Sequence, residues 1–350
     1  MKEQTPLLNI CVFILVLGLL TGAIGCRTAS SVGPSTTEAW RGLHVPVFST
    51  NQLYTLEGEL PKLAALGVNV VTVQVDYHFD FQSHPELRDK DFITKAQARE
   101  FSKTARKLGI RVIPELDCLG HQSLHTDTLP LLVKYPEFDE TAGQFPGNKG
   151  IYCRSWCPQN PGVHPIIFAL IDELAAAFQA DAFNAGLDEV FFMADDHCPL
   201  CHGQDPAKLF ALEVNTLHQH IVTERGWTML MWADRLLDAK TMGYGKWESA
   251  INGTAPAVDL IPKDIILCDW HYRPQTNYPS VPYLLGKGFR VWPSGFQPLE
   301  GAKALSQFSL EQRRNNPRLI GYLATTWSQS RKVDLGTWPP VAEVIPQWKQ

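Results

Sequence analysis

The chain has 350 residues, of which 31 are basic and 36 acidic, so its formal net charge is only −5. This mild acidity argues against a nucleic-acid partner, which would call for a strongly basic surface. The length is sufficient for one large domain such as an α/β barrel, which commonly takes about 250 residues. Ten tryptophans are many for this length, and their amphipathic rings suit both protein cores and the apolar faces of sugars.

The N-terminus has the pattern of an export signal. After Lys2 comes an apolar run that ends in small residues and a cysteine, LLNICVFILVLGLLTGAIGC, which is typical of a secretory signal. Its last four residues, AIGC, resemble a bacterial lipobox, and this resemblance implies lipidation of Cys26. A plain signal peptide and an uncleaved membrane anchor are the alternatives. We expect a signal peptide over residues 1–26, a tether over 27–39, and an exported protein that meets the membrane only through this anchor.

Beyond the tether, short apolar β-rich runs alternate with longer helical patterns, which is typical of a parallel sheet built from βα units. The predicted helices are 56–66, 94–108, 164–179, 206–224, 281–287, 299–314 and a short piece after Pro340, and Thr94 with Gln97 forms a capping box. Eight strands are predicted, at 41–48, 68–75, 110–116, 182–190, 228–234, 264–270, 289–295 and 319–327. Eight strands can close a barrel, so the sequence predicts a single (β/α)8 TIM barrel over residues 40–350.

In a barrel of this kind the chemistry gathers at the carboxyl ends of the strands. Long irregular segments are predicted on that side, at residues 130–161 and 238–262. The predicted strand ends carry acidic and aromatic residues: Asp76, Asp117 with His121, Asp188 with Glu189, Trp232 with Asp234, Trp270 with His271 and Tyr272, Trp292, and Trp327. Carboxylates beside aromatic walls suit the cleavage of glycosidic bonds, in which an acid protonates the leaving oxygen and a second group stabilises positive charge.

Asp188 and Glu189 are adjacent, and neighbouring side chains point to opposite faces of a regular strand. The two carboxylates therefore reach the same atom only if the strand ends before them. This spacing suits two separate tasks better than an acid and a nucleophile that face each other across one bond.

Two segments resemble the glycoside hydrolases of family 20, the β-N-acetylhexosaminidases. They are IRVIPELDCLGH at residues 110–121 and NAGLDEV at 184–190. WCPQNPGV, MWADRLLD, CDWHY, FRVWPSGF and ATTWSQ resemble further segments of the family in the same order, closest to its hexosaminidase D branch. The resemblance covers nearly the whole chain after Trp40.

The resemblance implies a substrate-assisted retaining mechanism on a terminal acetamido sugar, a carbohydrate substrate and no cofactor. Glu189 is then the general acid and base, and Asp188 orients the acetamido group, whose oxygen attacks the anomeric carbon. The other implied substrate-binding residues are Arg41, Asp117, His121, Trp232, Trp270, Tyr272, Trp292, Trp327 and Gln329. Structural roles stay open for several of them, above all a salt bridge for Arg41 and core packing for the tryptophans.

The chain departs from the family pattern at four places. Asn184 replaces a histidine, Leu187 a glycine, Gln329 a glutamate and Pro46 an aspartate. Leu187 is expected to crowd the approach to the carboxylates. The alternative to an enzyme is therefore a surface lipoprotein with an altered site that binds carbohydrate without cleaving it.

Six cysteines follow Cys26, and export permits disulfides among them. Cys198-Pro-Leu-Cys201-His202 has the spacing of a c-type haem attachment motif. Because His197 precedes it, a small zinc site is also possible, with Cys198 and Cys201 as weak candidate ligands. The readings that remain open are a disulfide or plain thiols, a metal site and, least favoured, haem.

Overall fold

The computed structural model describes Met1 and residues 38–349. The predicted signal peptide, the lipidation site Cys26 and most of the tether lie outside these residues. Within the described part of the chain, no helix is long and apolar enough to cross a membrane.

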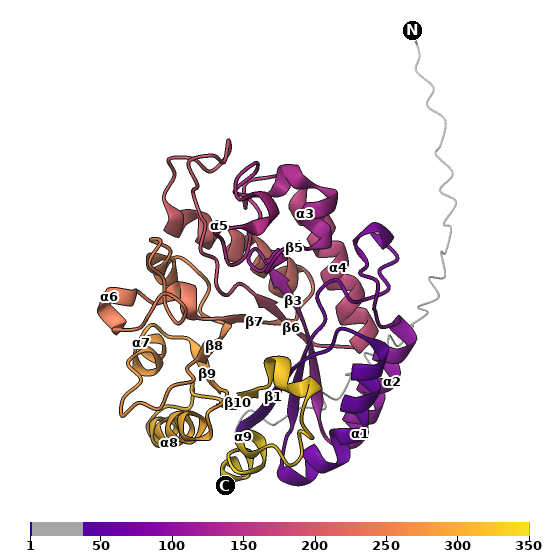
Figure 1. Ribbon diagram of the computed structural model, residues 1–350, viewed down its shortest axis with the longest axis vertical. Helices are drawn as coiled ribbons and strands as arrows, with labels where there is room; N and C mark the ends of the chain where they lie inside the picture. Colours follow the sequence, from indigo (N-terminus) through magenta and orange to yellow (C-terminus); the bar gives the residue numbers. More distant parts are fainter. Residues whose placement is uncertain (2–37, 350) are drawn as a thin grey trace. The chain divides into compact units, whose positions relative to one another are not determined.

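Eight parallel strands close into a barrel, as predicted. Around the barrel β1 pairs with β2 and β10, and every other neighbouring pair is also parallel (Figure 1). The strands are β1 (Trp40–Pro46), β2 (Val70–Gln74), β3 (Arg111–Cys118), β6 (Ala182–Gly186), β7 (Thr228–Trp232), β8 (Ile266–Trp270), β9 (Arg290–Gly295) and β10 (Gly321–Thr325). Closure removes free sheet edges and brings all eight carboxyl ends to one face.

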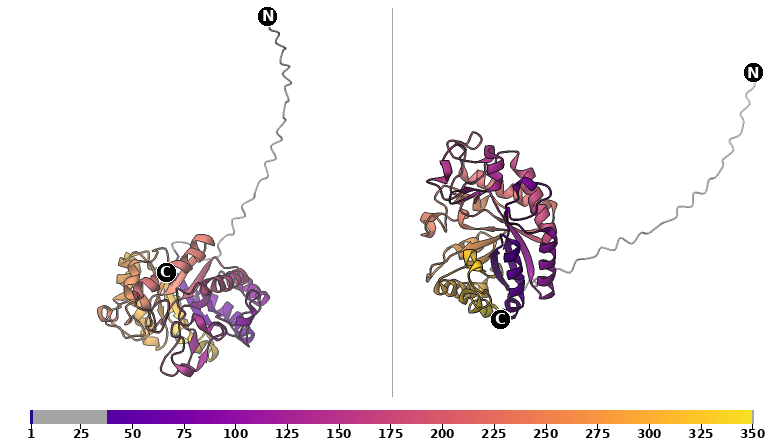
Figure 2. Two further views of the ribbon diagram at one scale, coloured as in Figure 1. Left: turned by 90° about the horizontal axis from the view of Figure 1, so that it is seen from above. Right: turned by 45° about the vertical axis from the view of Figure 1, so that its right-hand side comes forward.

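The helices lie around the outside of the barrel (Figures 1 and 2). They are α1 (Thr50–Leu66), α2 (Lys95–Lys107), α4 (Val163–Phe178), α5 (Pro206–His218), α7 (Ser280–Gly286), α8 (Leu299–Asn315) and the short α9 (Pro339–Ala342). The capping box of Thr94 and Gln97 at the start of α2 is confirmed. Helix α1 begins six residues earlier than predicted, because the Ser49 hydroxyl accepts a hydrogen bond from the Gln52 backbone and caps it there.

Two irregular segments lie on the carboxyl side, as the sequence indicates. The first follows β3 and contains the short strands β4 (Ser123–Leu124) and β5 (Asp127–Thr128), then α3 (Pro130–Lys134). The second follows β7, where α6 (Ala239–Met242) is only four residues long and no full-length barrel helix follows among the described elements. These segments supply side chains to the carboxyl face, and neither of them adds a strand to the barrel.

The interior of the barrel is filled by a compact apolar cluster whose buried members come from seven of the eight strands, with the partly buried Trp40 of β1 packed against it. Its buried members are Val70, Ile113, Ala182, Leu230, Trp232, Ile266, Cys268, Trp270, Trp292 and Leu323. Trp292 lies in this cluster, and its ring contacts the edge of Trp40 with 5.2 Å between centroids. A larger apolar cluster includes buried residues of the outer helices. Because its interior is packed, the barrel is a rigid support for the side chains at its carboxyl face.

The backbone leaves extended geometry where β6 ends. Gly186, Leu187 and Glu189 all have positive φ, of 65°, 71° and 49°. Gly186 also lies so close to β3 that a Cβ on it would meet Asp117 Oδ1 at 2.6 Å and Asp117 Cα at 2.8 Å. Glycine is therefore required here by both conformation and space. Because the strand stops at Gly186, strict alternation does not govern Asp188 and Glu189.

We expect Gly186→Ala to lower the free energy of unfolding more than Gly226→Ala does, as measured by urea denaturation. Gly226 has a similar φ of 73° but open space around its Cβ position. The control should cost about 1 kcal/mol for backbone strain alone, and Gly186→Ala roughly 1–3 kcal/mol more for the clash with Asp117. Equal losses in the two variants would contradict the close approach of β6 to β3.

Candidate active site

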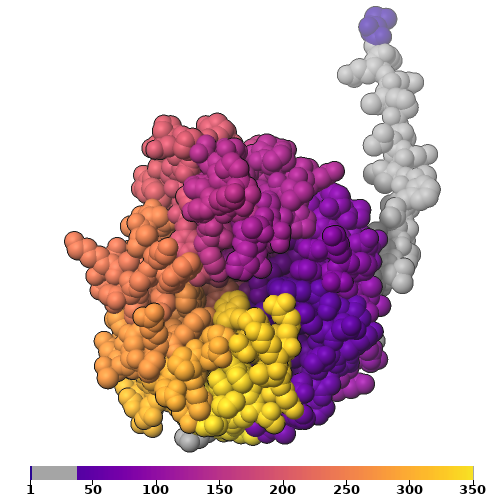
Figure 3. Space-filling view, viewed as in Figure 1, coloured from indigo at the N-terminus to yellow at the C-terminus, as the bar shows by residue number. Residues whose placement is uncertain are grey.

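A cavity of about 550 Å³ opens at the carboxyl ends of the strands, a volume within the usual range for small-molecule sites. In Figure 3 the N-terminal, central and C-terminal parts of the chain meet around the middle of this face. The cavity is lined by Pro46, Phe48, Gln74, Asp76, Tyr77, His78, Asp89, Asp117, His121, Ser123, Leu124, His125, Leu129, Tyr152, Asp188, Glu189, Trp270, Tyr272, Trp327, Ser328 and Arg331. The wall thus combines several carboxylates with aromatic rings.

His121 joins the two adjacent carboxylates. Its Nε2 lies 3.2 Å from Asp188 Oδ2 and 3.3 Å from Glu189 Oε2. Both carboxylates therefore reach the same nitrogen, which the positive φ of Glu189 makes possible just beyond the end of β6. His121 itself has a positive φ of 53°, and its loop passes close to the same segment, since a Cβ on Gly120 would meet the Asp188 carbonyl oxygen at 2.6 Å.

The charges of His121 and the two carboxylates stabilise one another. Burial opposes the charged form of Asp188, but the positive charge and hydrogen bond of His121 outweigh it, so the pKa of Asp188 is lowered. Burial also opposes the charged form of His121, but the carboxylates of Asp188 and Glu189 raise its pKa well above the ordinary value. An ionised Asp188 beside a protonated His121 is therefore the favoured state at neutral pH.

One oxygen of Asp188 has no partner among the described residues. The residue is only 7% exposed, and Oδ1 is buried without a hydrogen bond, while Oδ2 faces His121. A buried carboxylate oxygen without a donor is costly. Since Asp188 lines the cavity, a donor on a bound molecule could satisfy it.

A second acidic group lies where β2 and β3 end. Gln74 Nε2 donates to Oδ2 of Asp76 at 3.0 Å and to Oδ2 of Asp117 at 2.8 Å, and the Asp117 backbone donates to Asp76 Oδ1 at 2.9 Å. Burial raises the pKa of Asp76 to about 6, and burial together with the negative charge of Asp76 raises the pKa of Asp117 well above its usual range. This pair therefore holds a proton more readily than Asp188 does.

Asp234 holds Glu189 and Trp270 in place. Its Oδ2 accepts the Glu189 backbone N–H at 2.9 Å and Arg235 Nε at 2.6 Å, and its Oδ1 accepts Trp270 Nε1 at 3.2 Å. The side chain is almost wholly buried, and burial raises its pKa to about 6. One carboxylate thus positions both Glu189 and an aromatic wall.

The aromatic wall is formed by residues from the ends of β8 and β10. The rings of Trp270 and Tyr272 lie 5.0 Å apart, and Trp327 Nε1 donates to the Tyr272 hydroxyl at 2.7 Å. All three residues line the cavity. Trp232 lies one layer deeper, fully buried, with its ring 5.6 Å from that of Trp327 and its Nε1 bonded to Glu115 Oε1. It supports the wall from below instead of lining it.

Three predicted sugar contacts are placed elsewhere by the structure. Arg41 lies near the start of β1, at the opposite end of the barrel, where it pairs with Glu38 and donates to the Gly67 carbonyl oxygen, so the structural alternative is correct. Trp292 is fully buried in the barrel interior, with its Nε1 on the Trp40 carbonyl oxygen. Gln329 is not among the lining residues, and its neighbours Ser328 and Arg331 face the cavity instead.

Two departures from the family pattern also gain a structural account. Leu187 is completely buried in the larger apolar cluster and does not line the cavity, so the expected crowding of the carboxylates is wrong. Asn184 lies inside the barrel, where its Nδ2 donates to Glu115 Oε2 at 2.7 Å and its Oδ1 accepts the Gly186 backbone N–H at 3.2 Å. It supports the turn that carries the carboxylates.

Some lining residues received no role from the sequence. Gln74 and Asp76 lie at the end of β2, so the strand-end rule offered a signal for both. Tyr152 belongs to the irregular segment after β3, where its ring lies 4.8 Å from Trp247 and 5.9 Å from His121. No periodic pattern marks a residue in such a segment, and only the folded chain brings Tyr152 to the cavity.

Solved structures with a similar fold include a chitobiase and a β-N-acetylhexosaminidase. A chitobiase from Flavobacterium johnsoniae matches with a TM-score of 0.63 and 21% identity, over 88% of this chain and 48% of that one. A β-N-acetylhexosaminidase from Bacteroides fragilis matches with a TM-score of 0.64 and 15% identity, over 89% of this chain and 66% of the other. At these identities the likeness concerns the fold.

Curated relatives share shorter stretches of sequence. A β-hexosaminidase from Vibrio furnissii is 25% identical over 187 residues, which is 51% of this chain and 26% of the relative. A β-hexosaminidase from Akkermansia muciniphila is 32% identical over 109 residues, covering 31% of this chain and 21% of its own length. This chain therefore spans about a quarter of the length of these relatives.

The family model described as "Glycosyl hydrolase family 20, catalytic domain" matches residues 52–281, from helix α1 to the start of α7. The match includes Asp117, His121, Asp188, Glu189 and Trp270, which line the cavity. Because it covers well over half of the chain, the protein belongs to glycosyl hydrolase family 20.

Proposed function

We propose that the protein hydrolyses terminal β-linked N-acetylhexosamine from glycans by a retaining, substrate-assisted mechanism. The observation that carries this proposal is the buried, unpartnered Oδ1 of Asp188 beside Glu189 at the cavity wall. A 2-acetamido group offers an N–H donor for that oxygen, and its carbonyl oxygen offers a nucleophile. A plain hexose has a hydroxyl at that position and lacks the internal nucleophile.

The roles of the two carboxylates follow from their surroundings. The lowered pKa of Asp188 keeps it ionised, so it holds the acetamido N–H and stabilises the positive charge that develops when the acetamido oxygen attacks the anomeric carbon. Glu189 donates a proton to the leaving glycosidic oxygen as the bond breaks. It then takes a proton from the water that opens the cyclic intermediate, so the proton balance is restored.

The rest of the site positions these groups. Asp234 holds the Glu189 backbone and the Trp270 ring through one carboxylate. Trp270, Tyr272 and Trp327 present apolar surface to a sugar ring or its acetamido methyl group. The acidic pair of Asp76 and Asp117 also lines the cavity, where its oxygens can accept hydrogen bonds from sugar hydroxyls.

We infer the sugar from the relatives, and we assign it only as an acetamido hexose. The curated relatives include two β-hexosaminidases and a lacto-N-biosidase from Bifidobacterium bifidum, which is 22% identical over 197 residues. The segments of the later strands support placement near the hexosaminidase D branch. A terminal GlcNAc or GalNAc is the substrate class that agrees with both.

Glu189→Gln should lower kcat on unactivated β-linked chitobiose by about 100-fold to 10,000-fold, because the leaving oxygen loses its acid. The loss on the p-nitrophenyl β-glycoside of GlcNAc should be smaller, since that leaving group needs little protonation. Asp188→Asn should cost about 100-fold or more on both substrates. The rates are measured by sugar release and by absorbance of p-nitrophenol.

Glu100→Gln serves as the matched control, because Glu100 is an exposed residue of the outer helix α2. It should retain wild-type rates on both substrates. If the wild type and Glu189→Gln show the same negligible rate across a panel of hexosaminides while binding them, the alternative of a carbohydrate-binding protein on the same fold replaces the hydrolase.

His121→Gln should move the acidic limb of the kcat/KM profile to higher pH. Removing the positive charge leaves burial to dominate at Asp188, so its pKa rises and a higher pH is needed to ionise it. His218→Gln is the control, because His218 is the last residue of α5, pairs with Asp264 and is not among the residues that line the cavity. An unmoved limb in His121→Gln would show that His121 does not set the ionisation of Asp188.

We also propose that the chain is exported and anchored through a lipid on Cys26, with residues 27–39 as a tether. The support is the apolar run and the AIGC segment of the sequence. Full-length protein expressed in a bacterium and fed labelled palmitate should incorporate the label, and Cys26→Ser should not. A labelled band of equal intensity in Cys26→Ser would overturn lipidation at this residue.

A further inference from the structure

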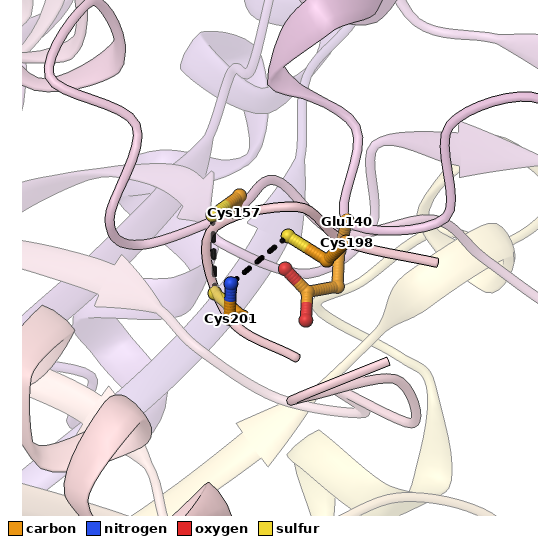
Figure 4. A group of neighbouring side chains, drawn as sticks. All are labelled: Glu140, Cys157, Cys198 and Cys201. Atoms are coloured by element: carbon orange, nitrogen blue, oxygen red, sulfur yellow. Dashed lines mark hydrogen bonds between the residues drawn. The ribbon is translucent and has the colours of Figure 1, made fainter. Parts of the chain in front are cut away.

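Four buried side chains outside the catalytic cavity converge on one point. They are Glu140, Cys157, Cys198 and Cys201, and the three sulfurs and one carboxylate oxygen all lie within 4.8 Å of one another (Figure 4). Cys157 Sγ and Cys201 Sγ are 3.1 Å apart. Each of the four residues is at most 2% exposed. The four come from two segments, one after β3 and one after β6, so the fold assembles the group.

The carboxylate of Glu140 is only half satisfied. One oxygen, Oε1, accepts the Asp195 backbone N–H at 3.0 Å, whereas Oε2 is buried and has no hydrogen bond to any residue that the structure describes. Figure 4 shows the Glu140 carboxylate directed toward the sulfurs. A buried carboxylate among thiols, with no cation to balance it, would be expensive.

A backbone amide points at one of the sulfurs. The Cys201 N–H donates to Cys198 Sγ at 3.4 Å. Such N–H groups stabilise thiolates, and hydrogen bonds of this kind orient the ligands of metal sites.

We propose that Cys157, Cys198, Cys201 and Glu140 bind one Zn²⁺ ion through three sulfurs and Glu140 Oε2. Three thiolates and one carboxylate supply the four ligands of a tetrahedral site, and soft sulfur ligands in this number favour zinc. The ion would neutralise part of the buried negative charge and give Oε2 its missing partner. This inference does not depend on the proposed hydrolysis.

The site is structural, because four protein ligands leave no position for water or substrate. It ties the segment after β3, which carries Glu140 and Cys157, to the segment after β6, which carries Cys198 and Cys201. The same two segments carry Tyr152 and Glu189 into the catalytic cavity. Cys153 links them as well, since its Sγ donates to the Glu189 carbonyl oxygen at 3.4 Å.

The other readings of the cysteine motif fit less well. His197 is exposed and contacts Asp195, and His202 is exposed beside Asp196, so neither histidine joins the sulfurs. Haem attachment would need His202 and both motif sulfurs on one open face, yet the sulfurs are buried. A disulfide between Cys157 and Cys201 would leave Cys198 and the Glu140 carboxylate buried without a cation.

The test measures metal in the full-length protein purified from cells supplied with zinc, by elemental mass spectrometry. We expect about one zinc per chain, and a loss of most of it in Cys198→Ser and Cys201→Ser. Glu140→Gln should bind zinc more weakly in competition with a chelator. Cys268→Ser is the control, because Cys268 is a buried cysteine of β8 outside the cluster, and it should keep the full zinc content.

A second measurement uses only the wild type, so it tests the proposal even if the cysteine variants fail to fold. Wild-type protein stripped with a chelator and loaded with Co²⁺ should show the sulfur-to-cobalt charge-transfer bands and the strong visible bands of a tetrahedral thiolate site. The proposal is overturned if the wild type binds neither zinc nor cobalt, whether its thiols are free or oxidised to a disulfide. It is also overturned if Cys198→Ser keeps the full zinc content.

Discussion

The contact of one imidazole with two carboxylates organises the catalytic face. His121 Nε2 lies within 3.3 Å of both Asp188 and Glu189, so the imidazole holds the ionised Asp188 and the neighbouring Glu189 side chain at one place in the cavity wall. Without the positive charge of His121, burial would favour the protonated form of Asp188. The loop that ends β3 and the turn that ends β6 must therefore meet, and the glycines at 120 and 186 allow that approach.

The backbone bears strain where this meeting occurs. Asp76, Leu119, His121, Leu187, Glu189 and Trp327 all have positive φ, although none is glycine, and they lie just beyond the ends of strands β2, β3, β6 and β10. Each such residue costs of the order of 1–3 kcal/mol. The packed barrel and the buried bonds of Asp234 and Glu115 hold these conformations in place. Strain concentrated at the mouth of a rigid barrel is the arrangement expected of a preorganised site.

Patterns with a fixed period were readable from the sequence. Eight apolar runs separated by helical patterns predicted the closed barrel, and the Thr94 capping box predicted the start of α2. The strand-end rule brought Asp117, Asp188, Trp270 and Trp327 to one face because parallel strands in a barrel share a direction. It misplaced Trp292, since the rule does not say how far a side chain lies from the end of its strand. For Arg41 the sequence allowed a sugar contact and a structural salt bridge equally, and the fold shows the salt bridge.

The sequence alone determined the order of the elements and the gathering of carboxylates at the strand ends. It also showed that the NAGLDEV segment matches a recognisable motif. Only the tertiary structure decided that Leu187 turns into the core, that Asp234 positions Glu189, and that Glu140 meets three cysteines. These outcomes depend on contacts between segments far apart in the chain and on backbone turns of positive φ. A local pattern carries no information on which distant segment will supply the partner of a buried charge.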